Sequence, residues 1–408
     1  MNGGPGTVLV GVAGYGRVHL DGIMRAHHRG DLTLVGVVDP LRARLDGVMG
    51  LVPGGVRRDQ DLGRALDALA PDVVVVAAPP HVHRTLVEQV AGAGAHVLVE
   101  KPPAVTVADL DAMTETVRAA AVRCQVNFTH AGCSLWARLR RMVANGVIGD
   151  VRHVAATGAW QRTAAYYQRA GWAGRLRLGA TPVLDGTVMN PFAHALFHAL
   201  DVAGWPELGG GQPASLEAEL YRAHDIEGDD TSSLRIATET GLVVVVATTL
   251  CATHEVDPCV RVHGSRGTAA VEYRTDTLVV EVDGRPPVVH RGRTIDLLDD
   301  LLEALAVDHA PACPLERTRT YLDAASRAYL SAGRPRALPV ESVRRAPLAG
   351  GDVRVTVPGI EALIARCGQD AALLSELGVT WARPGRRVTF DAPPAPVDPL
   401  AALEEARA

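Results

Sequence analysis

Residues 7 to 126 alternate between short apolar runs and helical segments, and this alternation restricts the fold more than any other feature of the chain. The first run, Thr7–Ala13, ends in a Gly-Tyr-Gly turn, and a helical segment follows it. Three further apolar runs follow, at 32–38, 72–78 and 96–99. Strands that alternate with helices through short loops form a parallel, doubly wound sheet, and such sheets bind ligands beyond the carboxyl ends of their strands. We therefore predict an α/β Rossmann domain over residues 1–126.

The Gly-Tyr-Gly turn predicts a site for the pyrophosphate of a dinucleotide. Gly14 permits a tight turn, and Gly16 lets backbone N–H groups approach a phosphate at the helix N-terminus. The third glycine of the G-x-G-x-x-G pattern is absent, because His19 occupies its position. Glycine turns of this kind also occur as plain strand–helix connections, so the turn alone leaves that alternative open.

The second apolar run supports the dinucleotide interpretation. It ends at Asp39, which lies about twenty residues beyond the glycines, where a carboxylate accepts hydrogen bonds from the ribose hydroxyls and repels a 2′-phosphate. This position favours NAD as the cofactor. NADP remains possible, because Arg42 and Arg44 follow closely and are able to fold over a 2′-phosphate.

A single lysine, Lys101, stands among 41 basic residues, so the other 40 are arginine. An ammonium group can turn three donors toward a substrate hydroxyl and shifts its pKa readily on burial, and a guanidinium does neither well. One lysine can also be chance. Lys101 follows the run at 96–99, however, where a buried strand would deliver it to the ligand-binding edge of the sheet. The loop Pro79–His83 falls on the same edge, and its two histidines either contact the nicotinamide or cap the following helix.

Four segments at these intervals, GVAGYGRVH, VVDP, AAPPHVH and VEKP, resemble the Gfo/Idh/MocA family of NAD(P)-dependent sugar and cyclitol oxidoreductases. The resemblance covers residues 7 to about 340. It implies that Lys101 lies beside the substrate and the nicotinamide. Together with the motifs above, it gives the predicted cofactor-binding residues Gly11, Gly14, Tyr15, Gly16, Arg17, Val18, Asp39, Pro79, His83, Glu100 and Lys101.

A second, α+β domain is predicted over residues 127–340. Apolar alternation at 214–223, 230–239, 242–249, 259–264, 268–273 and 277–283 indicates a large, open, mostly antiparallel sheet with one solvated or interface face. Two helices, near 296–307 and 315–333, are expected to close this domain. The resemblance implies that the sheet contributes one wall of the active site and often an oligomer interface. Residues 341–408, a C-terminal extension, contain a helical segment, a strand and the tail PPAPVDP; the extension is a lid, an interface arm or a partner-binding appendage.

Aromatic residues and arginines gather in the segment that follows residue 159. Trp160, Tyr166, Tyr167 and Trp172 lie within thirteen positions, and residues 160–180 also contain four arginines. Aromatic rings stack on sugars, and arginines bind carboxylates or phosphates. The alternative is a surface loop that its own aromatic residues hold in place.

The segment LDGTVMNPFAHALFHALDVAGW contains the predicted proton-transfer group. A helix is expected to start near Asn190, so that Asn190, His194 and His198 share one face at spacings of four. Three interpretations are open. His194 acts as a general acid/base, or His194 and His198 bind a metal together with Asp185, or both histidines are core residues. The family usually shows Asp-x-x-x-His here, but Met189 stands four residues after Asp185. Counting back ten residues from the glycine that closes the helix reaches His194, so the resemblance assigns the catalytic role to it.

These observations predict an oxidoreductase that transfers a hydride between NAD and a secondary alcohol or ketone of a sugar, cyclitol or sugar derivative. The predicted catalytic residues are Lys101, His194 and Asp185. The predicted substrate-binding residues are Lys101, Asn127, Tyr166, Trp172, Asp185, Asn190, His194 and His198. Two rivals remain, namely a glycosidase that uses NAD for transient oxidation and a non-enzymatic regulator that senses the dinucleotide.

Composition excludes several other classes of protein. The formal net charge of −5 disfavours a nucleic-acid binder. No apolar run is long enough to span a membrane, and the first residues lack the layout of a signal peptide. The six cysteines form no C-x-x-C pair, and no metal site is predicted. We expect a cytoplasmic homo-oligomer, a dimer or a tetramer, that binds a small molecule.

Overall fold

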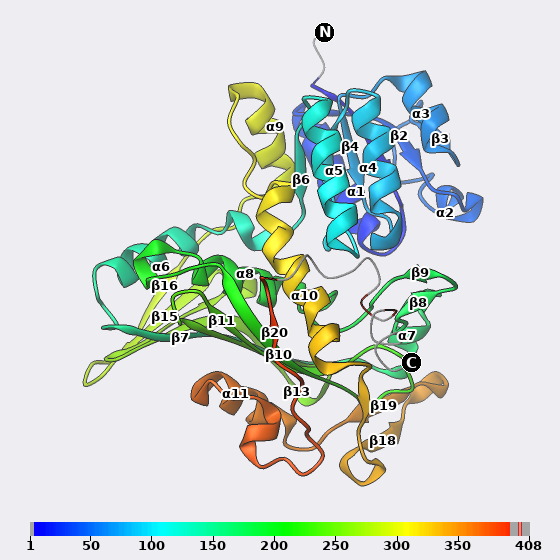
Figure 1. Cartoon of the computed structure of the whole chain (residues 1–408). Helices are drawn as coiled ribbons and strands as arrows, with labels where there is room; N and C mark the ends of the chain where they lie inside the picture. Colours follow the sequence, from blue (N-terminus) through cyan, green and yellow to red (C-terminus); the bar gives the residue numbers. More distant parts are fainter. Residues whose placement is uncertain (1–3, 392–398, 400, 402–408) are drawn as a thin grey trace. The chain divides into compact units, whose positions relative to one another are not determined.

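The computed structural model describes residues 4–391, 399 and 401, which form two compact units (Figure 1). The first unit combines the described residues up to Gly132 with Ile295–Arg319. The second unit comprises Cys133–Thr294 and the described residues from Thr320 onward.

The first unit contains a parallel sheet, as predicted. Among the described residues it has six strands in the order β3-β2-β1-β4-β5-β6, and every neighbouring pair is parallel. The strand order reverses between β1 and β4, which is where a doubly wound sheet binds its ligand. The strands are β1 (Gly6–Val10), β2 (Thr33–Val38), β3 (Arg57–Asp59), β4 (Val73–Val76), β5 (His96–Val99) and β6 (Cys124–Val126). The helices are α1 (Tyr15–Arg29), α2 (Arg42–Asp46), α3 (Leu62–Leu69), α4 (His83–Gly92) and α5 (Val107–Ala119).

Helix α9 (Leu297–Val307) belongs to the first unit, so the expectation that it would close the second domain was wrong. Its buried residues Leu297, Leu298 and Leu301 join the core formed by β1, β2 and α1. The Asp296 side chain caps the helix by accepting a hydrogen bond from the N–H of Leu298 at 2.8 Å. An apolar helix face shows that a helix packs against a core, but not against which core.

The second unit is built on a large, mostly antiparallel sheet, as predicted. Its order is β16-β15-β14-β13-β7-β12-β11-β10-β17, with β20 also paired to β10. The β7–β12 and β10–β17 pairs are parallel. The strands are β7 (Val151–Gln161), β10 (Pro213–Arg222), β11 (Thr231–Thr238), β12 (Val243–Thr249), β13 (Cys251–Gly264), β14 (Gly267–Glu272), β15 (Thr277–Val282), β16 (Val288–Arg291), β17 (Arg336–Ala337) and β20 (Val388–Thr389). Two small ribbons are also present, β8 (Arg177–Leu178) with β9 (Thr181–Pro182) and β18 (Arg344–Pro347) with β19 (Val353–Thr356).

Helices cover both faces of the central strands of this sheet (Figure 1). Phe192, just before α8 (Ala193–Ala203), lies against Gly158, and Gly368 of α11 (Ile360–Asp370) lies against Thr157. Adjacent residues of a strand point to opposite faces, so α8 and α11 cover opposite faces. The other helices of this unit are α6 (Ser134–Ala144), α7 (Ala164–Gln168) and α10 (Arg319–Ala332). Within the described residues, no helix has both the length and the apolar character that a bilayer crossing requires.

Part of the C-terminal extension packs into the core of the second unit. Ile360, Ile364 and Cys367 of α11 pack with Val245 and Ala247 of β12 in one buried cluster. This packing corrects the expectation of a solvated second face, because α11 covers β7, β12 and β13 there. The predicted strand near the chain end is present as β20, whereas residues 392–398 of the predicted tail lie outside the described residues.

Two stacked histidines on the large sheet give a prediction for pH-dependent stability. His153 of β7 and His263 of β13 are register partners whose ring centroids lie 4.1 Å apart. Burial, the neighbouring His153 and Arg261 lower the pKa of His263 to about 4. An unfolded histidine takes up its proton near pH 6.5, so below that pH the unfolded chain binds more protons and native stability falls. Discounted for partial exposure of the ring, this loss is about 1 kcal/mol between about pH 7 and pH 5.

We expect His263→Gln to remove that part of the pH dependence. Urea unfolding at the two pH values measures it, with His28→Gln, an exposed histidine on α1, as the control that keeps the wild-type slope. An unchanged pH slope in His263→Gln would show that the stacked pair does not resist protonation.

Candidate active site

The loop between β1 and α1 has the geometry of a phosphate cradle. Gly11 and Gly14 adopt positive φ values of 82° and 57°, which favour glycine. A Cβ atom on Gly16 would lie 1.9 Å from the carbonyl oxygen of Gly11, so the turn closes only around a glycine. No side chain of the described residues caps the N-terminus of α1. A helix end of this kind attracts an anion through its N–H groups and its dipole.

The other predicted residues of this turn surround the cradle. Tyr15 and Val18 have 51% and 52% of their surfaces exposed, and Arg17 is exposed between them. Asp39, at the end of β2, is buried against the loop. Its Oδ2 accepts a hydrogen bond from the N–H of Val12 at 3.2 Å, and its Oδ1 accepts one from the N–H of Leu41 at 3.0 Å. The cradle and this carboxylate together fit a dinucleotide.

A buried polar network joins the ends of β5 and β6 to α1. Glu100 Oε1 lies 2.6 Å from His19 Nε2 and accepts a hydrogen bond of 2.5 Å from Asn127 Nδ2. Burial alone would raise the pKa of Glu100, but the hydrogen bond from His19 and the charges of His19 and Lys101 together lower it. Glu100 therefore stays a carboxylate at neutral pH. The predicted residues Glu100, Lys101 and Asn127 thus lie together.

Sequence analysis missed His19, which it treated only as the position of an absent glycine. The signal was its place on α1, one turn beyond Gly16 and next to the buried Leu20. A polar residue beside the inward face of a helix needs a polar partner, and Glu100 supplies it.

The backbone around Lys101 is held from both sides. Glu100 donates its N–H to the carbonyl oxygen of Val76 at 2.9 Å, and the N–H of Lys101 donates to Glu100 Oε2 at 3.1 Å. On the other side, the buried ring of His83 lies 2.7 Å from the Ala78 carbonyl oxygen and 3.1 Å from that of Pro102. His83 thereby fixes the loop that carries Lys101, and its predicted contact with the cofactor stays a prediction. Pro79 is half-buried in the neighbouring loop.

In the second unit, Asp185 pairs with Asn190. Asp185 Oδ1 accepts a hydrogen bond from Asn190 Nδ2 at 3.0 Å, and its Oδ2 accepts one from the N–H of Gly174 at 2.6 Å. Helix α8 begins at Ala193, so the prediction that Asn190 shares a helix face with His194 was wrong. Asparagine and aspartate side chains compete with helix formation through such local hydrogen bonds, which delays the helix start.

The two histidines of α8 have different surroundings. His198 is 1% exposed, and its ring stacks on Trp136 of α6 at 4.6 Å and lies 5.0 Å from Phe197. His198 therefore matches the core alternative rather than the predicted substrate contact. His194 is only half-buried, so its ring is partly accessible, and its role in proton transfer stays a prediction.

The rings of the aromatic segment mostly contact arginines of the same segment. The guanidinium of Arg169 lies 3.7 Å from the ring centroid of Tyr166 and 4.8 Å from that of Trp172. Arg162 lies 5.1 Å from the ring of Trp160. These cation–π contacts support the alternative of a loop held by its own aromatic residues. Arg169 also connects the loop to Asp185, at 3.9 Å from Oδ2.

Comparison with known sequences identifies both parts of the chain. Residues 6–128 match the family model described as "Oxidoreductase family, NAD-binding Rossmann fold", and residues 136–270 match "GFO/IDH/MocA C-terminal domain". An inositol 2-dehydrogenase from Rhizobium meliloti (strain 1021) is 26% identical over 293 residues, which are 69% of this chain and 82% of that protein. A D-glucoside 3-dehydrogenase from Escherichia coli (strain K12) is 31% identical over 183 residues, 44% of this chain and 48% of that protein.

Solved structures share the fold. The WlbA dehydrogenase from Bordetella pertussis, in complex with NADH and UDP-GlcNAcA, superposes with a TM-score of 0.64 at 23% identity, over 79% of this chain and 95% of that one. An aldose-aldose oxidoreductase from Caulobacter crescentus, complexed with glycerol, gives a TM-score of 0.64 at 21% identity, over 80% and 97%. At these identities the likeness concerns the fold.

Proposed function

Since this chain belongs to the Gfo/Idh/MocA family of NAD-binding oxidoreductases, we propose that it oxidises or reduces a secondary alcohol on the ring of a sugar, a cyclitol or a sugar derivative. Two relatives named for such substrates, inositol and a D-glucoside, support the substrate class. The observation that carries the proposal is the position of Lys101, the sole lysine of the chain. It follows β5 at the carboxyl edge of the Rossmann sheet, next to the Glu100–His19–Asn127 network.

Lys101 acts on the reacting oxygen. Bound NAD supplies the hydride chemistry at its nicotinamide ring. The Lys101 ammonium donates a hydrogen bond to the substrate oxygen and stabilises the negative charge that develops on it. The positive charge of Lys101 helps to lower the pKa of the neighbouring Glu100 carboxyl group. Asn127 and His19 hold that carboxylate in place.

His194 takes up and returns the hydroxyl proton. Imidazole titrates near neutral pH, which suits a general acid/base. Asp185 and Asn190, which are hydrogen-bonded to each other, hold substrate hydroxyl groups in this proposal. Asp185 keeps acceptor capacity for this task, because an ionised carboxylate has about four lone-pair sites.

The test is NADH formation across a panel of ring alcohols: inositols, hexoses, methyl glucosides and UDP-linked N-acetylhexosamines. Thermal shift with NAD runs in parallel, to show that the protein is folded and binds the cofactor. We expect NADH from at least one member of the panel. A protein that binds NAD and yet forms NADH from none of them would contradict the proposal.

Asp39→Asn is expected to shift cofactor preference toward NADP. The substitution removes the charge that repels a 2′-phosphate and keeps one acceptor oxygen, which serves the N–H group of Val12 or that of Leu41 but not both. The ratio of kcat/KM for NADP over NAD should rise by about 10- to 100-fold. Asp67→Asn, the same charge change at an exposed position of α3, is the control and should leave the ratio unchanged. An Asp39 variant with the wild-type ratio would contradict this assignment.

A further inference from the structure

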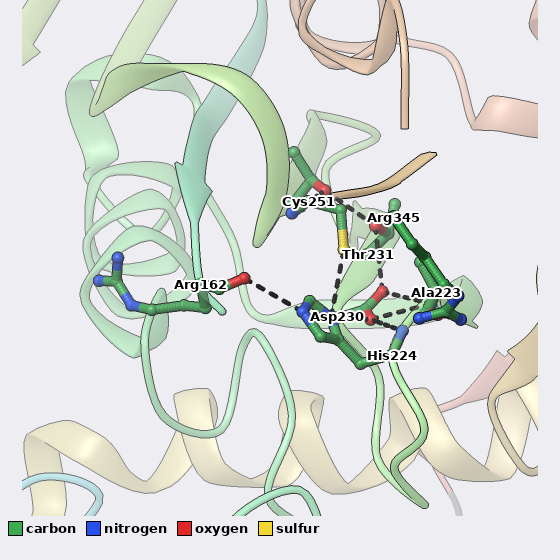
Figure 2. A network of polar contacts seen from close by, with 8 residues as sticks. Arg162, Ala223, His224, Asp230, Thr231, Cys251 and Arg345 are labelled. Atoms are coloured by element: carbon green, nitrogen blue, oxygen red, sulfur yellow. Dashed lines mark hydrogen bonds and ion pairs between the residues drawn. The ribbon is translucent and has the colours of Figure 1, made fainter. Parts of the chain in front are cut away.

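Three potential metal ligands converge in the core of the second unit, next to Tyr167 of the aromatic segment (Figure 2). His224 lies in the turn after β10, Asp230 lies directly before β11, and Cys251 begins β13. Their side chains are at most 4% exposed, and the ligand atoms all lie within 4.8 Å of one another. Nδ1 of His224 lies 2.8 Å from Asp230 Oδ2 and 3.5 Å from Cys251 Sγ.

This arrangement is not that of a nucleophilic cysteine. In a Cys–His–Asp catalytic arrangement, one ring nitrogen faces the thiol and the other faces the carboxylate. Here a single nitrogen, Nδ1 of His224, faces both groups. The thiol is also fully buried, and burial together with the nearby Asp230 raises its pKa. Convergence on one point is what metal coordination requires.

The second ring nitrogen fixes the orientation of the histidine. Nε2 of His224 lies 3.1 Å from the carbonyl oxygen of Arg162, which only accepts hydrogen bonds, so Nε2 carries a proton (Figure 2). The lone pair of a neutral Nδ1 then points at a carboxylate oxygen. Two acceptors at 2.8 Å need a positive species between them, which is a second ring proton or a metal ion. Histidines that bind metals usually donate their other N–H to a carbonyl or carboxylate in this way.

The carboxylate is held in place before any ion binds. Asp230 Oδ2 accepts hydrogen bonds of 2.8 Å from the N–H groups of Ala223 and His224. His224 also lines a cavity of about 1020 Å³, which Arg222, Arg345 and Tyr167 line as well. The His224 side of the cluster therefore borders a cavity that is large enough to hold an ion.

We propose that His224, Asp230 and Cys251 bind a Zn²⁺ ion. Thiolate, imidazole and carboxylate form a donor set typical of zinc. The 3.5 Å between Sγ and Nδ1 matches the separation of about 3.5 Å between sulfur and nitrogen ligands of a tetrahedral zinc ion. The 2.8 Å between Nδ1 and Oδ2 is about 0.5 Å shorter than for nitrogen and oxygen ligands, so the ion would move these two side chains apart by that amount. The charges of the ion, the thiolate and the carboxylate sum to zero, as a buried site requires. On binding, the Cys251 thiol proton and the Nδ1 proton of His224 leave to solvent, so two positive charges depart as the divalent ion enters, and a water molecule completes four ligands.

The ion would link the turn after β10 to the start of β13 and would be independent of the dinucleotide chemistry proposed above. Sequence analysis predicted no metal site, because these three residues form no ligand motif. Positions 224 and 251 are brought together by the antiparallel pairing of β10, β11 and β12, because His224 follows β10 and Cys251 follows β12.

Cobalt substitution of the full-length protein tests the site. The protein is stripped with a chelator and dialysed, and Co²⁺ is added alone, because a thiolate–cobalt bond gives a near-ultraviolet charge-transfer band. We expect this band in wild type and in Cys259→Ser, which removes another thiol of the same strand, but not in Cys251→Ser. In a second experiment, Zn²⁺ is added to the stripped wild-type protein, and mass spectrometry should find one zinc ion per chain. The zinc-free protein should have a Tm roughly 5 °C lower than the zinc-bound protein.

If a variant fails to fold, the zinc content and the cobalt spectrum of the wild-type protein are sufficient to test the proposal. A wild-type sample that takes up less than about a tenth of an equivalent of zinc and shows no charge-transfer band overturns the proposal. The cluster is then a protonated histidine paired with Asp230. A band that survives in Cys251→Ser and disappears in Cys259→Ser also overturns it, because the metal then binds elsewhere.

Discussion

Replacing Lys101 with alanine is expected to lower kcat for NADH formation by at least about 100-fold while NAD still binds. The substitution removes the donor that stabilises negative charge on the substrate oxygen and leaves the glycine cradle and Asp39 intact. Lys101 follows β5, and its backbone is fixed by Glu100 and, through the adjoining loop, by His83, so the loop should keep its conformation. Steady-state kinetics, with thermal shift for NAD binding, measure both effects.

Lys101→Arg is the matched variant, because it keeps the positive charge. A guanidinium is broader and presents a fixed fork of donors, so we expect it to restore less than about a tenth of the activity. The absence of any other lysine adds a second approach: reductive methylation modifies only Lys101 and the N-terminal amine. Full activity in Lys101→Ala would show that the lysine takes no part in the chemical step.

Replacing His194 with asparagine is expected to lower kcat/KM by about 100- to 10,000-fold, the usual contribution of a general acid or base. His194 is a half-buried residue of α8, so the fold should tolerate the smaller asparagine side chain. The distinguishing readout is the pH profile. In wild type, kcat/KM should have a limb with the pKa of a histidine, and this limb should disappear in His194→Asn.

His198→Phe is the control on the same helix. It keeps a ring against Trp136 and Phe197 and removes the titrating group, so the pH limb should remain. A variant at position 194 that keeps both its rate and its pH limb would exclude His194 as the proton-transfer group. Loss of the limb in His198→Phe instead would assign that role to the buried histidine.

Local sequence patterns were sufficient to predict both sheets. The run of four valines in β4 predicts a strand that is covered on both faces. The alternating runs from β10 to β15 predict an antiparallel sheet. The glycine turn before α1 and the position of Asp39 depend on spacing along the chain, so the cradle also followed from the sequence. Such features depend on neighbours within about twenty residues.

Other features depend on contacts between distant positions, which a single sequence does not contain. His19 and Glu100 are 81 positions apart, and nothing local to either residue indicates their pairing. The apolar face of α9 predicts burial but does not identify the core that buries it. The late start of α8 has a local cause instead: Asp185 and Asn190 are five positions apart, and their hydrogen bond competes with the helix that the spacing of Asn190 and His194 favoured.

Transfer of deuterium from substrate to cofactor tests the central claim most directly. A ring alcohol that forms NADH is prepared with deuterium on the carbon that is oxidised, and mass spectrometry follows the label. The account predicts deuterium in the released NADH, in an amount equal to the ketone formed. Deuterium that remains in a hydrolysed sugar, with the NAD unchanged, would contradict it and would indicate a glycosidase with transient oxidation.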